Sequence, residues 1–317
     1  MVGQLSTKSV NKNSFRYKLK KDLINNRGLY ALVLPGFVLL IIFSYIPMYG
    51  IIMAFQDYDP SLGIAGSPWV GFNNFIRFFQ GYYFAEVLQN TLIISLFSLA
   101  VGFIFPLIFA LSINNVENLA FKKVVQMISY APYFISVVVV VAMINIFFGS
   151  TGGVLNNFLE VLGTGAKINW ITNPKSFYAL YVWSGLWQIL GWNSIIYVSA
   201  LSNVNPELYE AATLEGATKL QKIWFIEIPS ILPTIVTLLI LSAGSILGVG
   251  FEKVYLMQNP DNLETSEVIS TYVYKKGILS SDYGFGTAVG LFNSVISFLV
   301  LLIVNFFAKK FTKYSVI

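Results

Sequence analysis

The sequence predicts an all-α integral membrane protein with six transmembrane helices and both termini in the cytoplasm. Three observations lead to this prediction: the composition, the spacing of long apolar runs, and the distribution of basic residues. Hydrophobic residues make up 56% of the 317-residue chain and charged residues only 11%, whereas a soluble domain typically carries about 25% charged residues. The composition therefore favours one membrane-embedded unit whose apolar surface faces lipid.

Six runs are long and apolar enough to cross a bilayer, since a transmembrane helix needs about 20 mostly apolar residues. The predicted spans are 29–55, 87–113, 124–148, 177–201, 229–250 and 284–308. No ionisable residue lies in the interior of a span, and Glu86 and Glu227 lie at span edges. The first run is longer than the apolar core of a signal peptide, and no small-residue cleavage site follows it. We therefore expect it to stay in the mature protein.

Basic residues predict the orientation, because cytoplasmic loops carry an excess of Lys and Arg. Fourteen lie in the two termini and in the loops after spans two and four, namely Lys8, Lys12, Arg16, Lys18, Lys20, Lys21, Arg27, Lys122, Lys123, Lys219, Lys222, Lys309, Lys310 and Lys313. Six lie on the other side, namely Arg77, Lys167, Lys175, Lys253, Lys275 and Lys276. We therefore expect a basic cytoplasmic tail over 1–28, a six-span domain over 29–308 with a cytoplasmic loop at 202–228, and a cytoplasmic tail over 309–317. The positive charge follows this topology and suits anionic lipid, so no nucleic-acid partner is expected.

The residue types that are missing exclude several kinds of chemistry. The chain has no Cys and no His, which removes the usual zinc, haem and iron–sulfur ligands and the Ser–His and Cys–His pairs. We expect no catalytic residue, no metal site and no cofactor in this chain. A proton-coupled carrier is disfavoured because it needs titratable groups inside its spans, whereas sodium coupling stays open. The sequence contains no Gly-Lys pair and so no phosphate-binding loop, and any energy from a nucleotide must come through another polypeptide.

The predicted loop 202–228 carries clear helix signals. Asn205 is a good N-cap and Pro206 suits the first helical position. Gly216 suits the left-handed conformation that ends a helix, and Thr218 can cap a second helix that leads into span five. Two interpretations follow from these residues alone: the first helix fits a groove on a partner protein, or it rests on the bilayer surface as an amphipathic helix.

The same loop resembles a known family. Glu210-Ala211-Ala212 followed by Gly216-Ala217, Phe225, Ile228-Pro229 and Pro233 is similar to the Glu-Ala-Ala loop of binding-protein-dependent ABC importer permeases. Glu215 departs from the motif, since many members have Asp there. The resemblance implies a type I ABC importer permease fold, in which this loop is the coupling helix that docks into an ATPase subunit. The residues that it assigns to ATPase coupling are Glu210, Ala211, Ala212, Glu215, Gly216 and Ala217.

Motifs along the rest of the chain are similar to the carbohydrate-uptake branch of the family, of the complex-oligosaccharide and maltose-permease type. They are Gln56-Asp57-Tyr58, Val70-Gly71-Phe72-Asn73-Asn74-Phe75, Asn90-Thr91-Leu92, Asn259-Pro260, Ser270-Thr271-Tyr272-Val273-Tyr274 and Gly286-Thr287-Ala288-Val289-Gly290-Leu291-Phe292. The resemblance implies a multi-pass protein of the bacterial inner or plasma membrane. It also implies a second homologous permease, two ATP-binding subunits that hold ATP and Mg, and an extracellular solute-binding lipoprotein that delivers a sugar or oligosaccharide.

A sugar presents hydroxyl edges and apolar faces, so its site should combine amides or hydroxyls with aromatic rings. The candidate residues of the substrate path are Trp187, Gln188, Trp192, Asn193, Ser242, Ser245 and Asn293. Each has a simpler alternative role, because aromatic residues often pack between membrane helices and Ser lets helices approach closely. Two functional alternatives also stay open: the same architecture with a non-sugar cargo such as a peptide, amino acid or ion, and a gradient-driven carrier.

Overall fold

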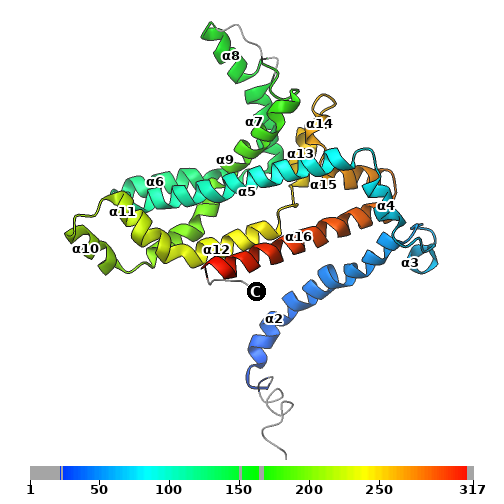
Figure 1. Ribbon diagram of the computed structural model, residues 1–317, viewed down its shortest axis with the longest axis horizontal. Helices are drawn as coiled ribbons and strands as arrows, with labels where there is room; N and C mark the ends of the chain where they lie inside the picture. Colours follow the sequence, from blue (N-terminus) through cyan, green and yellow to red (C-terminus); the bar gives the residue numbers. More distant parts are fainter. Residues whose placement is uncertain (1–21, 23, 150–151, 164–167, 313–317) are drawn as a thin grey trace, which may run out of the picture. The chain divides into compact units, whose positions relative to one another are not determined.

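The computed structural model describes residues 22, 24–149, 152–163 and 168–312 (Figure 1). Within these residues every regular element is a helix, and the one β-bridge joins Gln56 to Trp69. The all-α class expected from the composition is thereby confirmed. Most of the predicted tail 1–28, Lys167 and the last residues of the predicted tail 309–317 lie outside the described residues. The chain divides into two compact units, Met1–Ile52 and Met53–Ile317.

The first unit contains most of one apolar helical run. It comprises α2 (Arg27–Leu40), a π-helical turn (Ile41–Tyr45) and the start of a 3₁₀ segment (Ile46–Phe55). The whole run, Arg27–Phe55, has 29 residues and is long and apolar enough to cross a membrane. It corresponds to the first predicted span.

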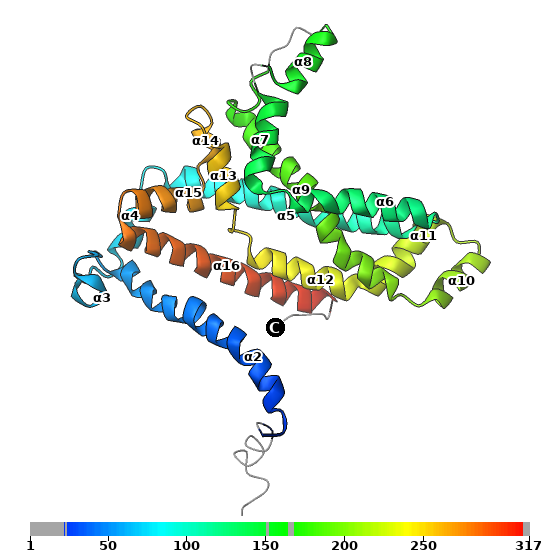
Figure 2. The same ribbon diagram turned by 180° about the vertical axis from the view of Figure 1, so that it is seen from behind.

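The second unit holds the remaining helices. The long ones are α5 (Phe84–Asn114), α6 (Leu119–Tyr130), α7 (Val137–Phe148), α9 (Pro174–Ser202), α12 (Ile228–Gly244) and α16 (Tyr283–Thr312). The short ones are α3 (Gly63–Gly66), α4 (Asn73–Phe79), α8 (Val154–Val161), α10 (Pro206–Leu214), α11 (Lys219–Lys222), α13 (Phe251–Met257), α14 (Leu263–Ser266) and α15 (Ile269–Val273). Figures 1 and 2 show α5, α6 and α9 running side by side, with α12 and α16 packed along each other.

Four described helical runs can cross a membrane by length and composition, or five if one bent pair is counted as a single span. The four are Arg27–Phe55, Phe84–Asn114, Lys219–Gly244 and Tyr283–Lys310, which overlap the predicted spans one, two, five and six. The predicted span 177–201 lies in α9, whose 29 residues reach about 43 Å but are less apolar because they include Ser, Gly and Asn. The span count of six stays a prediction.

The predicted span 124–148 is broken in the structure into two helices and stays a prediction as a membrane span. Helix α6, with the 3₁₀ turn Ala131–Phe134 that continues it, meets α7 at an angle of 102°. Ser136 starts α7 as its N-cap, accepting a hydrogen bond from the Val139 amide. The carbonyl of Ile135, at the bend, accepts a hydrogen bond of 2.8 Å from the Gln188 side chain of α9. A polar side chain from another helix therefore stabilises the break, as bilayer-embedded backbone requires.

Part of the core of the second unit lies between α5 and α9, and further buried clusters involve α7 and α13 and the start of α16. One cluster of Val101, Val182 and Leu186 packs at the middle of this contact, and a second cluster lies toward residues 201–204. Gly191 lets α9 approach α6 closely, since a Cβ atom on it would come within 2.2 Å of the Ser129 carbonyl oxygen. Apolar burial and close backbone approach thus hold α5, α6 and α9 together.

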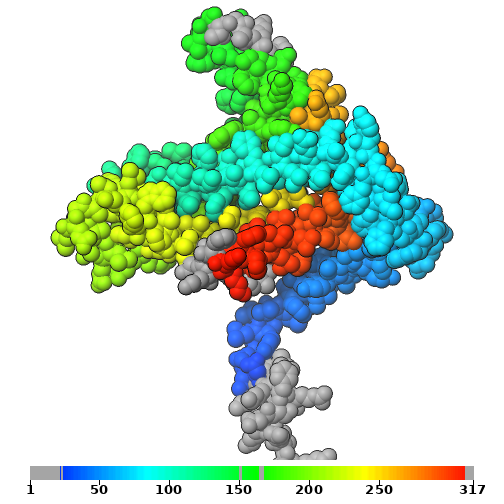
Figure 3. All heavy atoms as spheres, viewed as in Figure 1, coloured from blue at the N-terminus to red at the C-terminus, as the bar shows by residue number. Residues whose placement is uncertain are grey.

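The loop 202–228 and the 251–282 segment lie at different ends of the second unit. In Figure 3 the yellow-green atoms of α10 and α11 form one end, and the cyan and orange atoms around α4 and α15 lie toward the other. In the 251–282 segment, Asn90 of α5 donates to the carbonyls of Glu264 and Glu267 at 2.9 and 3.0 Å. Thr91 accepts from the Ile269 amide at 2.9 Å, so this segment is anchored on α5.

Candidate functional site

Helix α10 begins as its sequence predicts. The Asn205 side chain accepts a hydrogen bond of 3.1 Å from the Glu207 amide, and Pro206 occupies the first turn. Glu207 lies where the helix dipole favours negative charge. The capping expected from Asn205 and Pro206 is confirmed.

The end of α10 is a tight reversal at Gly216, whose φ is +76°. The Gly216 amide donates to the Thr213 carbonyl at 3.1 Å and the Ala217 amide donates to the Ala212 carbonyl at 2.8 Å. These two bonds form a Schellman motif, which satisfies carbonyls at a helix end. A Cβ atom on Gly216 would meet no other atom within 4 Å. The cost of a side chain there therefore comes from the backbone conformation, at about 1 kcal/mol.

The second helix of the loop leads directly into α12. Thr218 and Gln221 form a capping box, in which the Thr218 amide donates to the Gln221 side chain at 2.7 Å. Helix α11 is followed by a π-helical turn, Ile223–Glu227, and then by α12. A movement of the loop would thus act on one continuous helical run, Lys219–Gly244.

The loop exposes apolar side chains that have no cover within the described chain. Leu214 is 90% exposed and Phe225 is 78% exposed, and Leu208, Leu220 and Trp224 are exposed as well. Among the predicted coupling residues, Glu210, Ala211, Glu215 and Gly216 are exposed, whereas Ala212 and Ala217 are half-buried. Clustered exposed apolar side chains indicate an interaction surface. The structure brings all six of these predicted residues together around the turn at Gly216.

Behind this surface lies a buried carboxylate, Glu227, which is 0% exposed. It accepts hydrogen bonds from Asn114 and Asn115 at the end of α5 and from the Tyr209 hydroxyl of α10. A cavity of about 450 Å³ lies beside these groups. The sequence placed Glu227 only at a span edge, and no local signal could reveal partners more than a hundred residues away.

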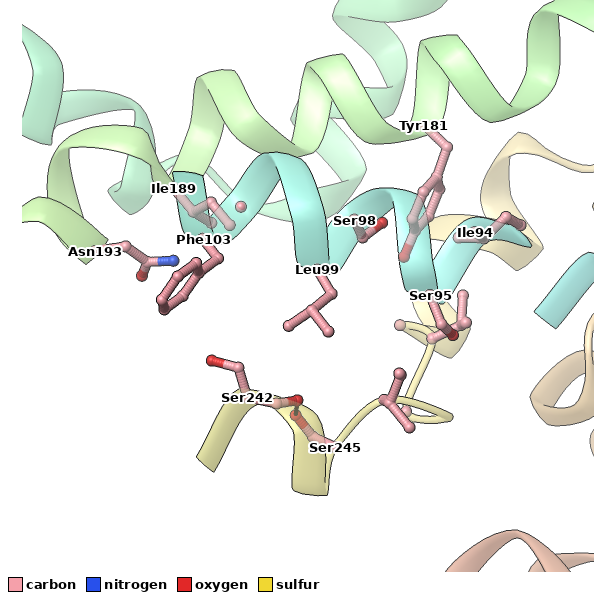
Figure 4. Close-up of a pocket in the computed structure, with 15 residues that line it drawn as sticks. Ile94, Ser95, Ser98, Leu99, Phe103, Tyr181, Ile189, Asn193, Ser242 and Ser245 are labelled. Atoms are coloured by element: carbon pink, nitrogen blue, oxygen red, sulfur yellow. Dashed lines mark hydrogen bonds between the residues drawn. The ribbon is translucent and has the colours of Figure 1, made fainter. Parts of the chain in front are cut away.

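A separate pocket of about 210 Å³ lies between α5, α9 and the end of α12. Figure 4 shows its side chains, with residues of α5 and α9 facing Ser242 and Ser245 at the end of α12. Its labelled polar groups are Ser95, Ser98, Tyr181, Asn193, Ser242 and Ser245. The apolar groups beside them are Ile94, Leu99, Phe103 and Ile189. All described side chains of the lining are uncharged.

The pocket owes its polarity partly to the early end of α12. The predicted span 229–250 stops being helical at Gly244, and residues 245–250 turn back as irregular backbone. Irregular backbone is tolerated at membrane depth where it lines a cavity. On the facing helix, the Ser95 hydroxyl is buried and has no hydrogen-bond partner among the described residues. This arrangement can bind a ligand that both donates and accepts hydrogen bonds.

The predicted substrate-path residues do not all come together. Asn193, Ser242 and Ser245 meet in the pocket, while Trp187 lines a different, apolar cavity of about 700 Å³. The remaining three lie outside both cavities. Trp192 stacks on Tyr133 with ring centroids 4.1 Å apart, Gln188 bonds to the bend at Ile135, and the Asn293 amide oxygen is buried in the unit without a described partner.

The sequence reasoning missed Ser95, Ser98 and Tyr181 as pocket residues. A hydroxyl in an apolar helix also serves close helix packing, so no local signal separates these residues from structural ones. Their spacing on one helical face was the only signal that could have found Ser95 and Ser98, since residues three apart on a helix are neighbours.

Comparisons with known proteins show what the chain is similar to. The chain is 42% identical over 95% of its length to the polygalacturonan/rhamnogalacturonan transport system permease protein YteP of Bacillus subtilis, covering 93% of that protein. It is 40% identical to the protein LplB of the same organism, with 94% and 92% of the two chains covered. A crystal structure of a bacterial alginate ABC transporter in complex with an alginate pentasaccharide-bound periplasmic protein contains a chain with a TM-score of 0.86 and 39% identity, covering 94% of this chain and 100% of that one.

The family comparison includes both the loop and most of the pocket. Residues 102–313 match the family described as the binding-protein-dependent transport system inner membrane component. This range contains α9, the whole loop 202–228 and the end of α12. The chain therefore belongs to the family of inner membrane components of binding-protein-dependent transport systems.

Proposed function

We propose that this membrane transport subunit carries an oligosaccharide through the pocket between α5, α9 and α12. The observation that carries the proposal is the near full-length likeness to the permease of a polygalacturonan/rhamnogalacturonan transport system and to a chain of an alginate importer. The uncharged, hydroxyl-rich lining supports it, because sugars offer hydroxyls that donate and accept. Ser95, Ser98, Tyr181, Asn193, Ser242 and Ser245 form the proposed path. For Trp187, Gln188, Trp192 and Asn293, the packing role is the simpler explanation.

The loop 202–228 is the proposed docking site for an ATPase subunit. Its exposed apolar side chains and its continuity with α12 support this role. Glu210, Ala211, Ala212, Glu215, Gly216 and Ala217 would form the contact. ATP and Mg would bind to two such partner subunits, and a second, homologous permease would complete the membrane core.

The proposed orientation has six spans and both termini in the cytoplasm. It places the loop 202–228 on the inner side and the 251–282 segment on the outer side, where a solute-binding lipoprotein would deliver the sugar. The separation of these two regions in the unit supports the arrangement. Accessibility labelling of single Cys residues at Thr213 and Asp261, in a chain free of other Cys, tests it; outward labelling of Thr213→Cys would overturn it.

Reconstituted transport tests the cargo. The complex with its second permease, ATPase and binding protein should take up labelled oligogalacturonides or alginate oligomers into vesicles. Uptake should occur only when ATP is present on the side of the membrane where the ATPase lies. Uptake of amino acids or peptides in place of sugars would overturn the proposed cargo. Uptake that persists with an ATPase unable to hydrolyse ATP would favour a gradient-driven carrier instead.

A further inference from the structure

We propose that Glu227 is a positioning residue that ties the docking helix α10 to the ends of α5 and α12, so that movement of α10 is transmitted to the transmembrane helices. This inference rests on the proposed function of the loop 202–228. It assigns to Glu227 the link between α10 and the ends of α5 and α12. The helix caps and the exposed docking surface do not form this link.

The first step is the position of the carboxylate. Glu227 is the last residue of the π-helical turn, directly before α12. The Asn114 side chain donates to its Oε1 atom at 2.8 Å, and the Asn115 side chain donates to Oε1 and Oε2 at 3.0 and 3.2 Å. These bonds join the start of α12 to the end of α5.

The second step is the link to α10. The Tyr209 hydroxyl lies 3.4 Å from Glu227 Oε1 and 3.4 Å from Asn114 Nδ2. Burial raises the pKa of the Tyr209 hydroxyl, and the negative charge of Glu227 raises it further, so the hydroxyl keeps its proton and can donate. Tyr209 is the residue directly before Glu210, which belongs to the exposed docking surface. One side of α10 therefore faces the proposed ATPase and the other contacts the buried carboxylate.

The third step is the cost of placing a charge there. A buried carboxylate is tolerated when it is fully hydrogen-bonded or paired. No described basic residue forms an ion pair with Glu227. Lys219 pairs with Glu117, and Lys222 donates to Thr213. Asn114, Asn115 and Tyr209 are thus its described side-chain partners. Separation of α10 from α5 would remove the Tyr209 hydroxyl from this set and leave the carboxylate with the two Asn side chains. Such a group favours concerted movement of the three elements.

The fourth step is the local helix geometry. A π-helical turn inserts one extra residue, weakens the regular hydrogen-bond ladder and often marks a functional position. In this chain the turn Ile223–Glu227 lies at the end of the loop 202–228, between α11 and α12. A bend at this point would let α10 swing independently, and the Glu227 contacts act against that movement.

The experiment uses the full reconstituted complex with its binding protein and measures oligosaccharide imported per ATP hydrolysed. Tyr209→Phe removes only the hydroxyl that joins α10 to Glu227, and loss of one hydrogen bond corresponds to about a fivefold change in an equilibrium. We expect the import-to-hydrolysis ratio to fall by about this factor, with normal protein level and normal ATPase co-purification. Glu227→Leu should lower the ratio more, and Glu227→Gln, which retains an acceptor for both Asn side chains, should restore most of it.

Glu117→Gln is the matched control. Its carboxylate faces the same cavity but is 86% exposed, and its ion pair with Lys219 lies at the surface, so the ratio should stay at the wild-type value. An unchanged ratio in both Tyr209→Phe and Glu227→Leu would overturn the inference. The proposed function would still stand in that case, provided that the wild-type complex imports sugar. If Glu227→Leu does not accumulate in the membrane, Tyr209→Phe and Glu227→Gln decide the question. Failure of the wild-type complex to import any sugar would instead count against the proposed function.

Discussion

The loop 202–228 and the 251–282 segment are both built from short helices, yet their side chains make different kinds of contact with the rest of the chain. In the 251–282 segment, Asn262 donates to two carbonyls and Glu267 pairs with Lys275 at 2.5 Å, while the buried Gln258 Oε1 atom has no described partner. The loop exposes Leu214 and Phe225 and is tied to the ends of α5 and α12 by the contacts of Glu227. The segment is thus anchored by several polar contacts within the chain, whereas the loop is tied to the rest of the unit through the cluster around Glu227.

The largest expected effect concerns the rigidity of the 251–282 segment. Asn262 is 1% exposed, and its side chain donates to the carbonyls of Ile171 and Met257 at 3.1 and 3.0 Å. Asn262→Leu leaves the Met257 carbonyl, the Asn259 amide and the Ser266 hydroxyl without this partner, and each buried unpaired group costs about 1–3 kcal/mol. Thermal unfolding in detergent should show a loss of about 3 kcal/mol or more. The neighbouring exposed change Asp261→Asn is the control, and equal behaviour of the two variants would contradict a self-sufficient segment.

Lys253 is a buried basic residue of the same segment, and its removal should give the second-largest change in stability. Its ammonium group is buried, donates to the Tyr181 carbonyl at 2.9 Å and lies 4.8 Å from the Tyr181 ring centroid. Burial lowers the pKa of Lys253 from 10.5 to about 8. The unfolded chain therefore binds more protons than the folded one between about pH 8 and 10.5, and stability should rise with pH across this window.

Lys253→Met tests this expectation by removing the titrating group. The free energy of unfolding of the variant should no longer rise with pH. At pH 7 it should exceed that of the wild type by up to about 3 kcal/mol, because no charge is buried on folding, less the contribution of the lost hydrogen bond. Unfolding midpoints measured from pH 7 to 10 in detergent give both quantities. A pH profile that is the same in wild type and variant would place the proton uptake elsewhere.

The third effect concerns the loop and should affect binding more than stability. Gly216→Val forces a β-branched residue to a φ of +76° at a cost of about 1 kcal/mol, and should shift the turn that presents Glu210 and Ala211. We expect the variant to reach the membrane but to retain less ATPase in co-purification. Gly216→Asn is the matched control because Asn tolerates the left-handed conformation. Undiminished ATPase recovery with Gly216→Val would show that docking does not depend on this turn.

The smallest effect belongs to a surface ion pair between α4 and the start of α16. Arg77 Nη2 lies 2.7 Å from Asp282 Oδ2, and the two side chains are 49% and 33% exposed. Exposed pairs contribute about 0–1 kcal/mol, so Arg77→Gln should lower the free energy of unfolding by less than about 1 kcal/mol. The difference from wild type should shrink at high salt. A loss comparable with that of Asn262→Leu would show that the segment depends on its surface contacts after all.

Local signals in the sequence predicted the loop well, because its structure depends on neighbouring residues. Asn205, Pro206, Gly216 and Thr218 each act within a few positions, and each adopts the expected capping or left-handed role. The composition likewise sufficed for the helical class. Family resemblance added the docking hypothesis, which physics alone left equal to a helix resting on lipid.

Features that depend on distant contacts could not be predicted in this way. Pro132 and the N-cap Ser136 mark a break before α7 locally, but the contact of Gln188 from another helix with the bend could not be read from them. Two of the three described partners of Glu227, Asn115 and Asn114, lie 112 and 113 residues earlier in the chain. For the pocket, Asn193, Ser242 and Ser245 were chosen by residue type, and only the packing of α5, α9 and α12 separates them from Trp187, which faces elsewhere.

The early end of α12 at Gly244 has a consequence for the orientation of an acidic sugar. A helix carries a partial negative charge of about half a unit at its carboxyl end, and this end lies beside Ser242 and Ser245 at the pocket. Hydroxyl hydrogens of a sugar are attracted to that end, whereas a uronate group is repelled. In the proposed path, an acidic sugar unit would therefore pass α12 with its hydroxyl edge toward the helix and its carboxylate turned away.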